Sequence, residues 1–199
     1  FNKDDPSTWL KYSGRIDPIL DMGTTSTITY KSFSLNASFL LRLGHHKRLN
    51  PLYPRNASEI APTPEMNLSR EMLDRWRKPG DEARTTIPGY ANWDRTSYIP
   101  LEVGNVVGGA SPYSIYDRSS VRVVKGDFFR CTNVSLGYAL PAASVKRFGA
   151  RGMNIGFSVN NPFIITSKAF HGQDPETVGT GGTSLPITAS YTMSLNVSF

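Results

Sequence analysis

The clearest pattern in the chain is an alternation of apolar and small polar residues between positions 33 and 43. The stretch reads FSLNASFLLRL, and only Leu40 breaks the pattern, on its polar side. A period of two residues predicts a β-strand with one apolar face. Its length matches the roughly 9–11 residues with which a tilted strand crosses the core of a bilayer. The apolar face of this predicted strand holds Phe33, Leu35, Ala37, Phe39, Leu41 and Leu43.

A second strand is predicted just before it, in the stretch MGTTSTITY, with threonines on the polar face and Met22 and Ile28 on the apolar face. Only the pair Lys31–Ser32 separates the two strands. A two-residue hairpin loop places its flanking residues opposite each other, with their side chains on the same face. Tyr30 and Phe33 both belong to apolar faces, so the expected register is consistent. We therefore expect residues 22–43 to form a β-hairpin.

Three more strands of this type are predicted nearer the C-terminus. Their stretches are RCTNVSLGYAL at 130–140, MNIGFSVNN from Met153, and SYTMSLNVSF at 190–199. Pro141 ends the first of them, because proline cannot donate to a strand ladder. Residues 142–149, AASVKRFG, are expected to form a single helical turn that stops at glycine.

The second face of these strands carries Asn, Ser, Thr and Gly rather than Lys and Glu, which favours a water-filled lumen over open solvent. Short and long connections alternate, and Tyr30, Phe33, Tyr138 and Phe199 lie at the strand ends with short connections, as in an aromatic girdle. These patterns predict an all-β fold made of antiparallel strands of a large transmembrane β-barrel in the bacterial outer membrane. The expected parts are an extracellular loop segment at 1–21, the hairpin at 22–43, a long extracellular loop at 44–126, and barrel strands at 127–199 with the turn 142–149 on the periplasmic side.

Composition narrows the choice further. The chain of 199 residues has no run of about 18 apolar residues, so a transmembrane helix is not expected. Its net charge is +6, but Lys and Arg do not gather on one periodic face, which argues against nucleic-acid binding. Cys131 is the only cysteine, so we expect neither a disulfide nor a thiolate metal site. The chain opens on Phe1 without a signal-peptide pattern, and we interpret it as a processed or excised portion of a longer protein.

Several segments between about residue 22 and the end occur in the same order as the segments of a known protein family. Besides the hairpin and the terminal strand they are RWRKPGD at 75–81, KGDFFRCTNVSLGYALP at 125–141, GMNIGFSVNNPFIIT at 152–166 and GQDPE at 172–176. Together they resemble the C-terminal part of the SusC/RagA-type TonB-dependent outer-membrane transporters of Bacteroidetes. The resemblance implies the last strands of a plugged barrel of about 22 strands. Such barrels import oligosaccharides or peptides, are powered through TonB, and usually work beneath a SusD-like surface lipoprotein.

The resemblance also implies a role for the last strand. In such barrels this strand pairs with the first and carries the recognition signal for the barrel-assembly machinery. The signal consists of a polar residue, a glycine and two hydrophobic positions that end on an aromatic residue. Thr192, Ser194, Val197 and Phe199 occupy these places, and Ser194 stands where glycine is usual.

The segment 44–126 is expected to dock a lipoprotein partner or to shape the substrate vestibule. Aromatic residues and arginine, the types enriched at interface cores, recur along it. Packing over the rim of the barrel is the alternative. The candidate interface residues are Arg75, Trp76, Arg77, Tyr90, Trp93 and Tyr98.

No catalytic constellation, metal cluster or cofactor motif stands out, and we do not expect an enzyme. His45 and His46 are adjacent, so they would point to opposite faces of a strand. His171 lies near Asp174 and Glu176, but GQDPE matches the loop motif of the family rather than an acid–base site. GTGGTS at 179–184 is expected to be a flexible loop, since it neither follows a strand nor opens a helix. A soluble β-sandwich that binds carbohydrate or protein remains the alternative function class, with the apolar faces packed together.

Overall fold

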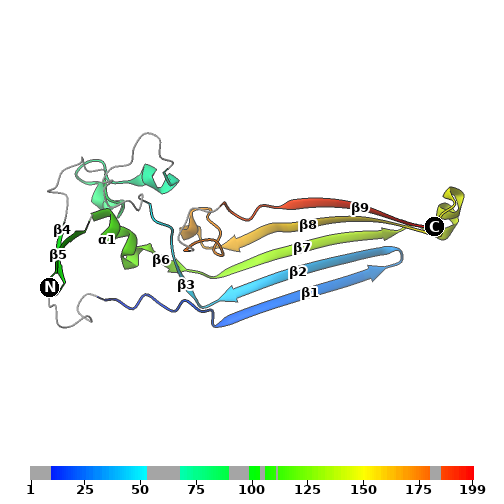
Figure 1. Cartoon of the computed structure of the whole chain (residues 1–199), viewed down its shortest axis with the longest axis horizontal. Helices are drawn as coiled ribbons and strands as arrows, with labels where there is room; N and C mark the ends of the chain where they lie inside the picture. The colour runs from blue at the N-terminus through cyan, green and yellow to red at the C-terminus, as the bar shows by residue number, and fades with distance from the viewer. Residues whose placement is uncertain (1–9, 53–67, 90–98, 104–105, 111, 180–184) are drawn as a thin grey trace. The chain divides into compact units, whose positions relative to one another are not determined.

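The structure is a computed structural model, and it describes residues 10–52, 68–89, 99–103, 106–110, 112–179 and 185–199 (Figure 1). The chain divides into two compact units. One unit holds Arg15–His45, Lys125–Thr177 and Leu185–Phe199, and the other holds the described parts of Phe1–Gly14, His46–Val124 and Val178–Ser184.

The first unit is built on one antiparallel sheet of five long strands in the order β1-β2-β7-β8-β9. Figure 1 shows these strands side by side in a single layer. The alternation of apolar and small polar residues explains why they are extended, because it gives each strand one apolar and one polar face. The strands span Leu20–Tyr30 (β1), Phe33–Leu43 (β2), Phe128–Ala139 (β7), Gly152–Thr166 (β8) and Ser190–Ser198 (β9).

The hairpin of β1 and β2 has the register that the sequence predicts, with Tyr30 opposite Phe33. Lys31 turns the chain with a positive φ of 52°. The strand β1 begins earlier than residue 22, because Asp21 pairs with Arg42 across the ladder and the two side chains form an ion pair at 2.9 Å. Asp21 therefore belongs to β1, although it lies before Met22, where the predicted alternation begins.

Two irregularities interrupt the ladders on either side of β7. The pairing of β2 with β7 shifts between Ser38 and Phe39, and Thr132 is the extra residue on β7. The hydroxyl of Thr132 donates to the carbonyl of Ser38 at 3.1 Å. Such a bulge changes which face the following side chains occupy. It explains why the apolar residues of β7 sit at odd positions before Thr132 and at even positions after it.

The strand β8 is longer than the sequence indicates, since it continues past residue 161 to Thr166. Asn161 has a positive φ of 50°, and Pro162 follows it. Both lie where the register between β7 and β8 shifts, and proline is tolerated in a sheet at such a bulge. The alternation thus breaks at these two residues, but the strand does not.

The connection between β7 and β8 contains the expected helical turn. It consists of α2 (Ala142–Val145) and the 3-10 turn η6 (Lys146–Phe148), and Gly149 follows with a φ of 72°. The backbone N–H of Gly149 donates to the carbonyl of Lys146 at 3.1 Å, which closes the turn. None of the described helices is long and apolar enough to cross a membrane.

The segment between β2 and β7 contains short regular elements that the sequence pattern does not reveal. The strands β3 and β6 form one two-stranded sheet, and β4 and β5 form another. A small apolar core of Leu52 and Met72 packs against Leu68, Ile87 and Tyr116. The elements are β3 (His46–Arg48), η2 (Arg70–Asp74), η3 (Asp81–Ala83), β4 (Ile99–Val103), β5 (Val106–Ala110), α1 (Pro112–Arg118), η5 (Ser120–Arg122) and β6 (Val123–Lys125).

Candidate functional site

One face of the five-stranded sheet is apolar and exposed. The register places the alternating apolar residues of all five strands on it, so that Leu35 lies opposite Ile28 and Leu136, and Leu136 lies opposite Phe157. Such a large exposed apolar surface marks a contact with lipid or with another protein. The more exposed members are Met22, Ile28, Tyr30, Phe33, Leu35, Leu136, Phe157, Phe163, Ile165, Tyr191, Met193, Leu195 and Phe199.

Aromatic rings cluster on this face in pairs from neighbouring strands. Phe33 and Tyr138 lie with their ring centroids 4.5 Å apart, next to the turn between β1 and β2. Phe129 lies 5.5 Å from Phe39 and 6.3 Å from Phe163 at the other end of the sheet. Aromatic pairs at these distances add to the energy of apolar contact. The two ends of the apolar face therefore carry aromatic side chains from adjacent strands.

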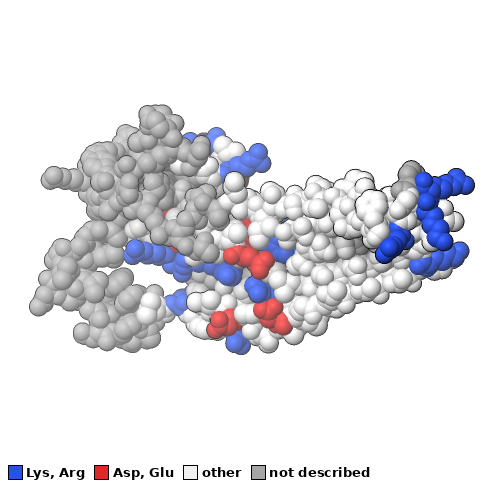
Figure 2. Space-filling view, turned by 45° about the vertical axis from the view of Figure 1, so that its right-hand side comes forward, with Lys and Arg blue, Asp and Glu red and all other residues white. Residues whose placement is uncertain are grey.

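Charged side chains are confined to the two ends of the sheet. We call the end with the β1–β2 turn and the β7–β8 connection the hairpin end, and the opposite end the loop end. Within the five strands, the charged residues are Asp21, Arg42 and Arg130, all at the loop end. Figure 2 shows the same distribution on the face in view, with an uncharged middle between coloured ends. The apolar face is thus crossed by a continuous band without charge.

The other face is lined by small polar side chains that bond across the strands. The Thr27 hydroxyl donates to the Asn36 amide oxygen at 2.7 Å, and the Asn133 amide donates to that of Asn160 at 2.8 Å. Asn160 in turn donates to the Ser190 hydroxyl at 3.3 Å. These rows satisfy hydroxyl and amide groups with one another and hold them on one surface. The result is a polar wall without charge in its middle part.

Two glycines in this wall allow a close approach between strands. A Cβ at Gly137 would lie 2.6 Å from the Ser34 hydroxyl oxygen, and a Cβ at Gly156 would lie 2.5 Å from that of Ser194. The register links all four residues in one row across the sheet. The resemblance assigns Ser194 to the assembly signal. Its side chain occupies the space that a Cβ on Gly156 would need.

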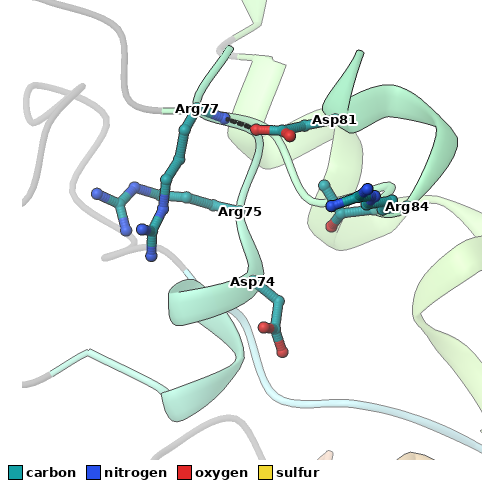
Figure 3. Close-up of a pocket in the computed structure, with 6 residues that line it drawn as sticks. Asp74, Arg75, Arg77, Asp81 and Arg84 are labelled. Atoms are coloured by element: carbon teal, nitrogen blue, oxygen red, sulfur yellow. Dashed lines mark hydrogen bonds between the residues drawn. The ribbon is translucent and has the colours of Figure 1, made fainter. Parts of the chain in front are cut away.

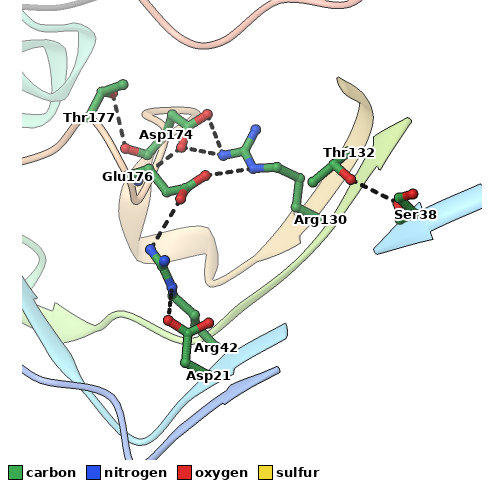
Figure 4. A network of polar contacts seen from close by, with 8 residues as sticks. All are labelled: Asp21, Ser38, Arg42, Arg130, Thr132, Asp174, Glu176 and Thr177. Carbon is green, nitrogen blue, oxygen red and sulfur yellow. Dashed lines mark hydrogen bonds and ion pairs between the residues drawn. The ribbon is translucent and has the colours of Figure 1, made fainter. Parts of the chain in front are cut away.

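At the loop end, the loop after β8 folds onto the polar face through a network of ion pairs (Figure 4). The Arg130 guanidinium donates from Nη2 to both carboxylate oxygens of Asp174 at 2.6 and 2.7 Å, and its Nε lies 2.8 Å from Glu176. Arg42 donates to Glu176 at 3.1 Å and to Asp21 at 2.9 Å. One chain of alternating charges therefore ties β1, β2 and β7 to the loop.

The inner part of this network is buried, and the outer part is partly exposed. The side chains of Arg130 and Asp174 are each 3% exposed, whereas that of Arg42 is 34% exposed. The ring of Phe128 lies 5.7 Å from the Arg130 guanidinium and 5.8 Å from that of Arg42, so both cations contact the same aromatic ring. Charge-assisted bonds to a buried guanidinium are short and directional, and they fix the geometry of the groups they join.

The GQDPE segment is thus a structural clamp. Asp174 and Glu176 are occupied by the two arginines, and Asp174 also accepts the backbone N–H of Glu176 at 2.9 Å. His171 is exposed and ends η7 (Lys168–Phe170) with a φ of 50°. Sequence reasoning missed the partnership with Arg130. The available signal was that Arg130 is a charged residue next to a long uncharged strand pattern.

Three of the six predicted interface residues lie in a described turn between η2 and η3. Arg75 and Arg77 line a shallow hollow together with Asp74, Asp81, Arg84 and Thr85. Figure 3 shows the guanidinium ends of Arg75 and Arg77 extended to the same side, away from Asp81. Tyr90, Trp93 and Tyr98 lie outside the described residues.

Trp76 and Glu82 stiffen this turn. The indole N–H of Trp76 donates to the Glu82 carboxylate at 3.0 Å, and the backbone N–H of Gly80 donates to it at 2.8 Å. The backbone N–H of Glu82 itself, then Trp76 and then Gly80 lower the pKa of the Glu82 carboxyl from its ordinary value, because each hydrogen bond favours the ionised form. Asp81 accepts the backbone N–H groups of Arg77 and Lys78, both at 3.1 Å. The Arg75 and Arg77 guanidinium groups donate back to the carbonyl oxygens of Met72 at 3.0 Å and Leu73 at 2.7 Å, so both arginines are held against η2.

The predicted assembly residues lie on both faces of β9. Thr192 and Ser194 belong to the polar face, and Val197 belongs to the apolar face together with Met193 and Leu195. The Phe199 side chain is 79% exposed. Among the described residues, no group of three or more His, Cys, Asp or Glu side chains is arranged to hold a metal ion.

No protein-family profile matches the chain, and no curated protein sequence matches it. Solved structures do match. A chain of the RagAB peptide importer in the open-open state aligns with a TM-score of 0.59 and 22% identity, over 92% of this chain and 17% of that one. The closed-closed state gives a TM-score of 0.58 and 19% identity over the same shares. A further structure of the RagAB peptide transporter gives 0.56 and 21%, over 90% of this chain and 17% of the other.

These matches concern the fold. The chain has an all-β fold that resembles part of a RagAB chain, and the all-β prediction from the alternation is confirmed. It spans 17% of the length of the chains that it matches. The neighbours are components of a transporter rather than enzymes.

Proposed function

We propose that the five strands form part of the wall of a transmembrane β-barrel in a bacterial outer membrane. The observation that carries the proposal is the exposed apolar face crossed by a band without charge. In β2 this band covers Phe33–Leu41, about 30 Å along the strand at about 3.4 Å per residue. With a strand tilt of about 40°, its height is about 23 Å, close to the apolar band of such barrels at about 25 Å.

The polar face of the sheet supports the same proposal. Barrel strands alternate between lipid-facing apolar residues and lumen-facing polar residues. The ladder of Thr, Ser and Asn side chains would then face water inside the barrel, and the clamp around Arg130 would lie at the extracellular rim of the lumen. Open sheet edges are not tolerated in hydrocarbon, so β1 and β9 would pair with strands outside this five-stranded sheet.

The resemblance of sequence and fold supports a barrel of the SusC/RagA type. We infer a role in active import across the outer membrane, powered through TonB by a plug elsewhere in the protein. Peptides are the favoured cargo, since the solved neighbours are structures of a peptide importer, and oligosaccharides are the second class. The soluble β-sandwich is less well supported, because Ile28, Met193 and Leu195 on the apolar face are at least 60% exposed.

Spin labels on adjacent residues of β7 test the membrane role. In the full-length protein, with Cys131 replaced by serine, one label replaces Leu136 and another replaces Ser135. We expect apolar oxygen to relax the label at Leu136 and a water-soluble nickel chelate to relax the label at Ser135. A label at Leu136 that is accessible only to the nickel chelate, or to neither reagent, contradicts a lipid-facing sheet. The second result is the one expected for a packed sandwich.

We propose that the turn around Trp76 docks a SusD-like lipoprotein. Arg75, Trp76 and Arg77 lie in a turn that hydrogen bonds hold in one conformation, and arginine and tryptophan are frequent at the centres of interfaces. The test is cross-linking in intact cells from a cysteine at Lys78, with a cysteine at Lys146 of the β7–β8 connection as the control. Capture of the lipoprotein from Lys78 alone supports docking. Capture from Lys146 alone contradicts the topology, and capture from neither contradicts the docking role.

A further inference from the structure

We propose that four basic side chains at the hairpin end bind the headgroup phosphates of anionic phospholipids. The site consists of Lys31, Lys146, Arg147 and Arg151. The proposal rests on the proposed membrane role. It adds a lipid class, the anionic phospholipids, and one leaflet, the one at the hairpin end of the sheet. Neither the fold resemblance nor the pattern of strand faces assigns any role to these residues.

The backbone brings the four residues to one end of the sheet. Lys31 lies in the β1–β2 turn, Lys146 and Arg147 lie in η6, and Arg151 directly precedes β8. The N–H of Ala139 donates to the carbonyl of Ser32 at 2.9 Å, which joins the two connections. The N–H of Arg151 donates to the carbonyl of Ser198 at 2.7 Å, which holds it against β9. Figure 2 shows the resulting group of blue side chains at one end of the sheet.

The positive charge of this end is not balanced by acidic side chains nearby. All four residues are exposed, and neither connection contains Asp or Glu. The strand segments 22–30, 33–41, 131–139 and 152–166 contain none either. At the loop end, by contrast, Arg42 and Arg130 are both paired with carboxylates. At the hairpin end, basic side chains are therefore grouped without an acidic side chain among them, and they can meet an anion from outside the sheet.

The position relative to the apolar band selects a lipid as the source of that anion. Tyr30, Phe33 and Tyr138 form the last row of the band before the turn, and the Lys31 ammonium lies 5.3 Å from the Tyr30 ring centroid. Aromatic residues of this kind sit at the level of the lipid headgroups. The basic groups beyond them therefore meet the headgroup phosphates, to which arginine can bond with two parallel N–H groups.

A membrane surface suits this site better than a free phosphate ion does. The four side chains are exposed and spread over two connections, so they do not enclose a single small anion. A leaflet presents many phosphates in one plane, and clusters of four or more basic residues next to an apolar segment are the pattern that anionic lipids attract. The expected ligand is therefore an anionic phospholipid such as phosphatidylglycerol.

The test compares two triple variants of the full-length protein in detergent. One variant carries Lys146→Gln, Arg147→Gln and Arg151→Gln. The control removes the same charge from exposed residues at the loop end, with Arg15→Gln, Lys125→Gln and Lys168→Gln. Native mass spectrometry measures the binding of phosphatidylglycerol, and of phosphatidylcholine as a neutral lipid. We expect the hairpin-end variant to bind phosphatidylglycerol at least about tenfold more weakly than the wild type, and the control to bind it as the wild type does.

Two further measurements separate the possible failures. Equal binding of phosphatidylglycerol by both variants, or equal binding of the two lipids by the wild type, overturns the lipid site. Displacement of the lipid by inorganic phosphate at similar concentration also overturns it, since the site would then recognise a free anion. Heat-modifiable migration in gel electrophoresis reports the folded barrel in every variant. If it is present while the lipid site fails, the membrane role stands; if it is absent in the wild type, the membrane role fails.

Discussion

At the scale of single residues, the best-defined feature is the buried pair of Arg130 and Asp174. Both charges are removed from water, which costs free energy that their mutual attraction only partly returns. What the pair provides is a fixed position for the loop after β8, because the guanidinium bonds to both carboxylate oxygens.

Removing one partner of the pair should therefore be more harmful than removing both. We expect Arg130→Met to lower the free energy of unfolding by about 3–5 kcal/mol, since it leaves Asp174 buried without its counter-charge. Combining it with Asp174→Asn should restore part of that loss. Urea-induced unfolding of the full-length protein in detergent measures both effects.

The control for this prediction is Arg42→Met, whose half-exposed ion pairs should contribute no more than about 1 kcal/mol. Equal losses for Arg42→Met and Arg130→Met would show that burial does not set the strength of the network. A double variant that is no better than Arg130→Met alone would show that the loss comes from packing rather than from charge.

Asn161 makes a second prediction at this scale. Its φ of 50° lies in the left-handed region, which asparagine and glycine adopt more easily than other residues. Asn161→Val should cost about 1–2 kcal/mol of unfolding free energy, because a β-branched side chain clashes there. Asn161→Gly should be close to neutral. If the two variants unfold alike in urea, the bulge in β8 does not have this backbone conformation.

At the scale of elements, each strand separates two environments, and adjacent residues test them directly. Leu195 belongs to the apolar face of β9, and Asn196 belongs to the polar face. We expect Leu195→Arg to cost about 1 kcal/mol, because Leu195 shares a row with Phe33 and Tyr138 at the edge of the apolar band, where arginine on the lipid face costs less than it does near the midplane of a barrel. Asn196→Arg should cost far less, since its guanidinium would reach the water of the lumen. The folded fraction in gel electrophoresis without heating is the measurement.

Similar losses for both variants of β9 would indicate a sheet buried on two sides, as in a sandwich. The bulge at Thr132 matters for the choice of such pairs. Val134 and Leu136 share the apolar face with Phe129, although their positions differ in parity. An experiment that assigned faces by alternation alone would place the residues before Thr132 on the wrong side.

At the scale of the whole molecule, the terminal strand bears on the assembly of the proposed barrel. Phe199 and Met193 are exposed to similar extents, 79% and 77%, so each would contact lipid in the proposed barrel. If Phe199 is part of the proposed assembly signal with Thr192, Ser194 and Val197, Phe199→Ser should reduce the amount of barrel in the outer membrane far more than Met193→Ser. Immunoblots of outer-membrane fractions measure this. Equal reductions would leave Phe199 as an ordinary lipid contact.

The sequence by itself determined the strands and their two faces. A period of two residues is a local property, and it is readable wherever one face of a strand meets a different medium from the other. The register of the β1–β2 hairpin followed as well, because a two-residue turn leaves a single way to oppose Tyr30 and Phe33. The candidate turn at Arg75–Arg77 was found from composition and a turn signal, again within a few residues.

Only the tertiary structure decided which distant residues meet. Arg130 and Asp174 are 44 positions apart, and nothing local to either residue selects the other. The bulges at Thr132 and Asn161 depend on the neighbouring ladders, so the alternation of a single strand cannot place them. The same holds for the short elements between β2 and β7, which are held by a small core and by the buried pair of Arg122 and Glu71 rather than by a periodic pattern. Local patterns record the medium that surrounds a strand, whereas partners are set by how the strands and loops fold together.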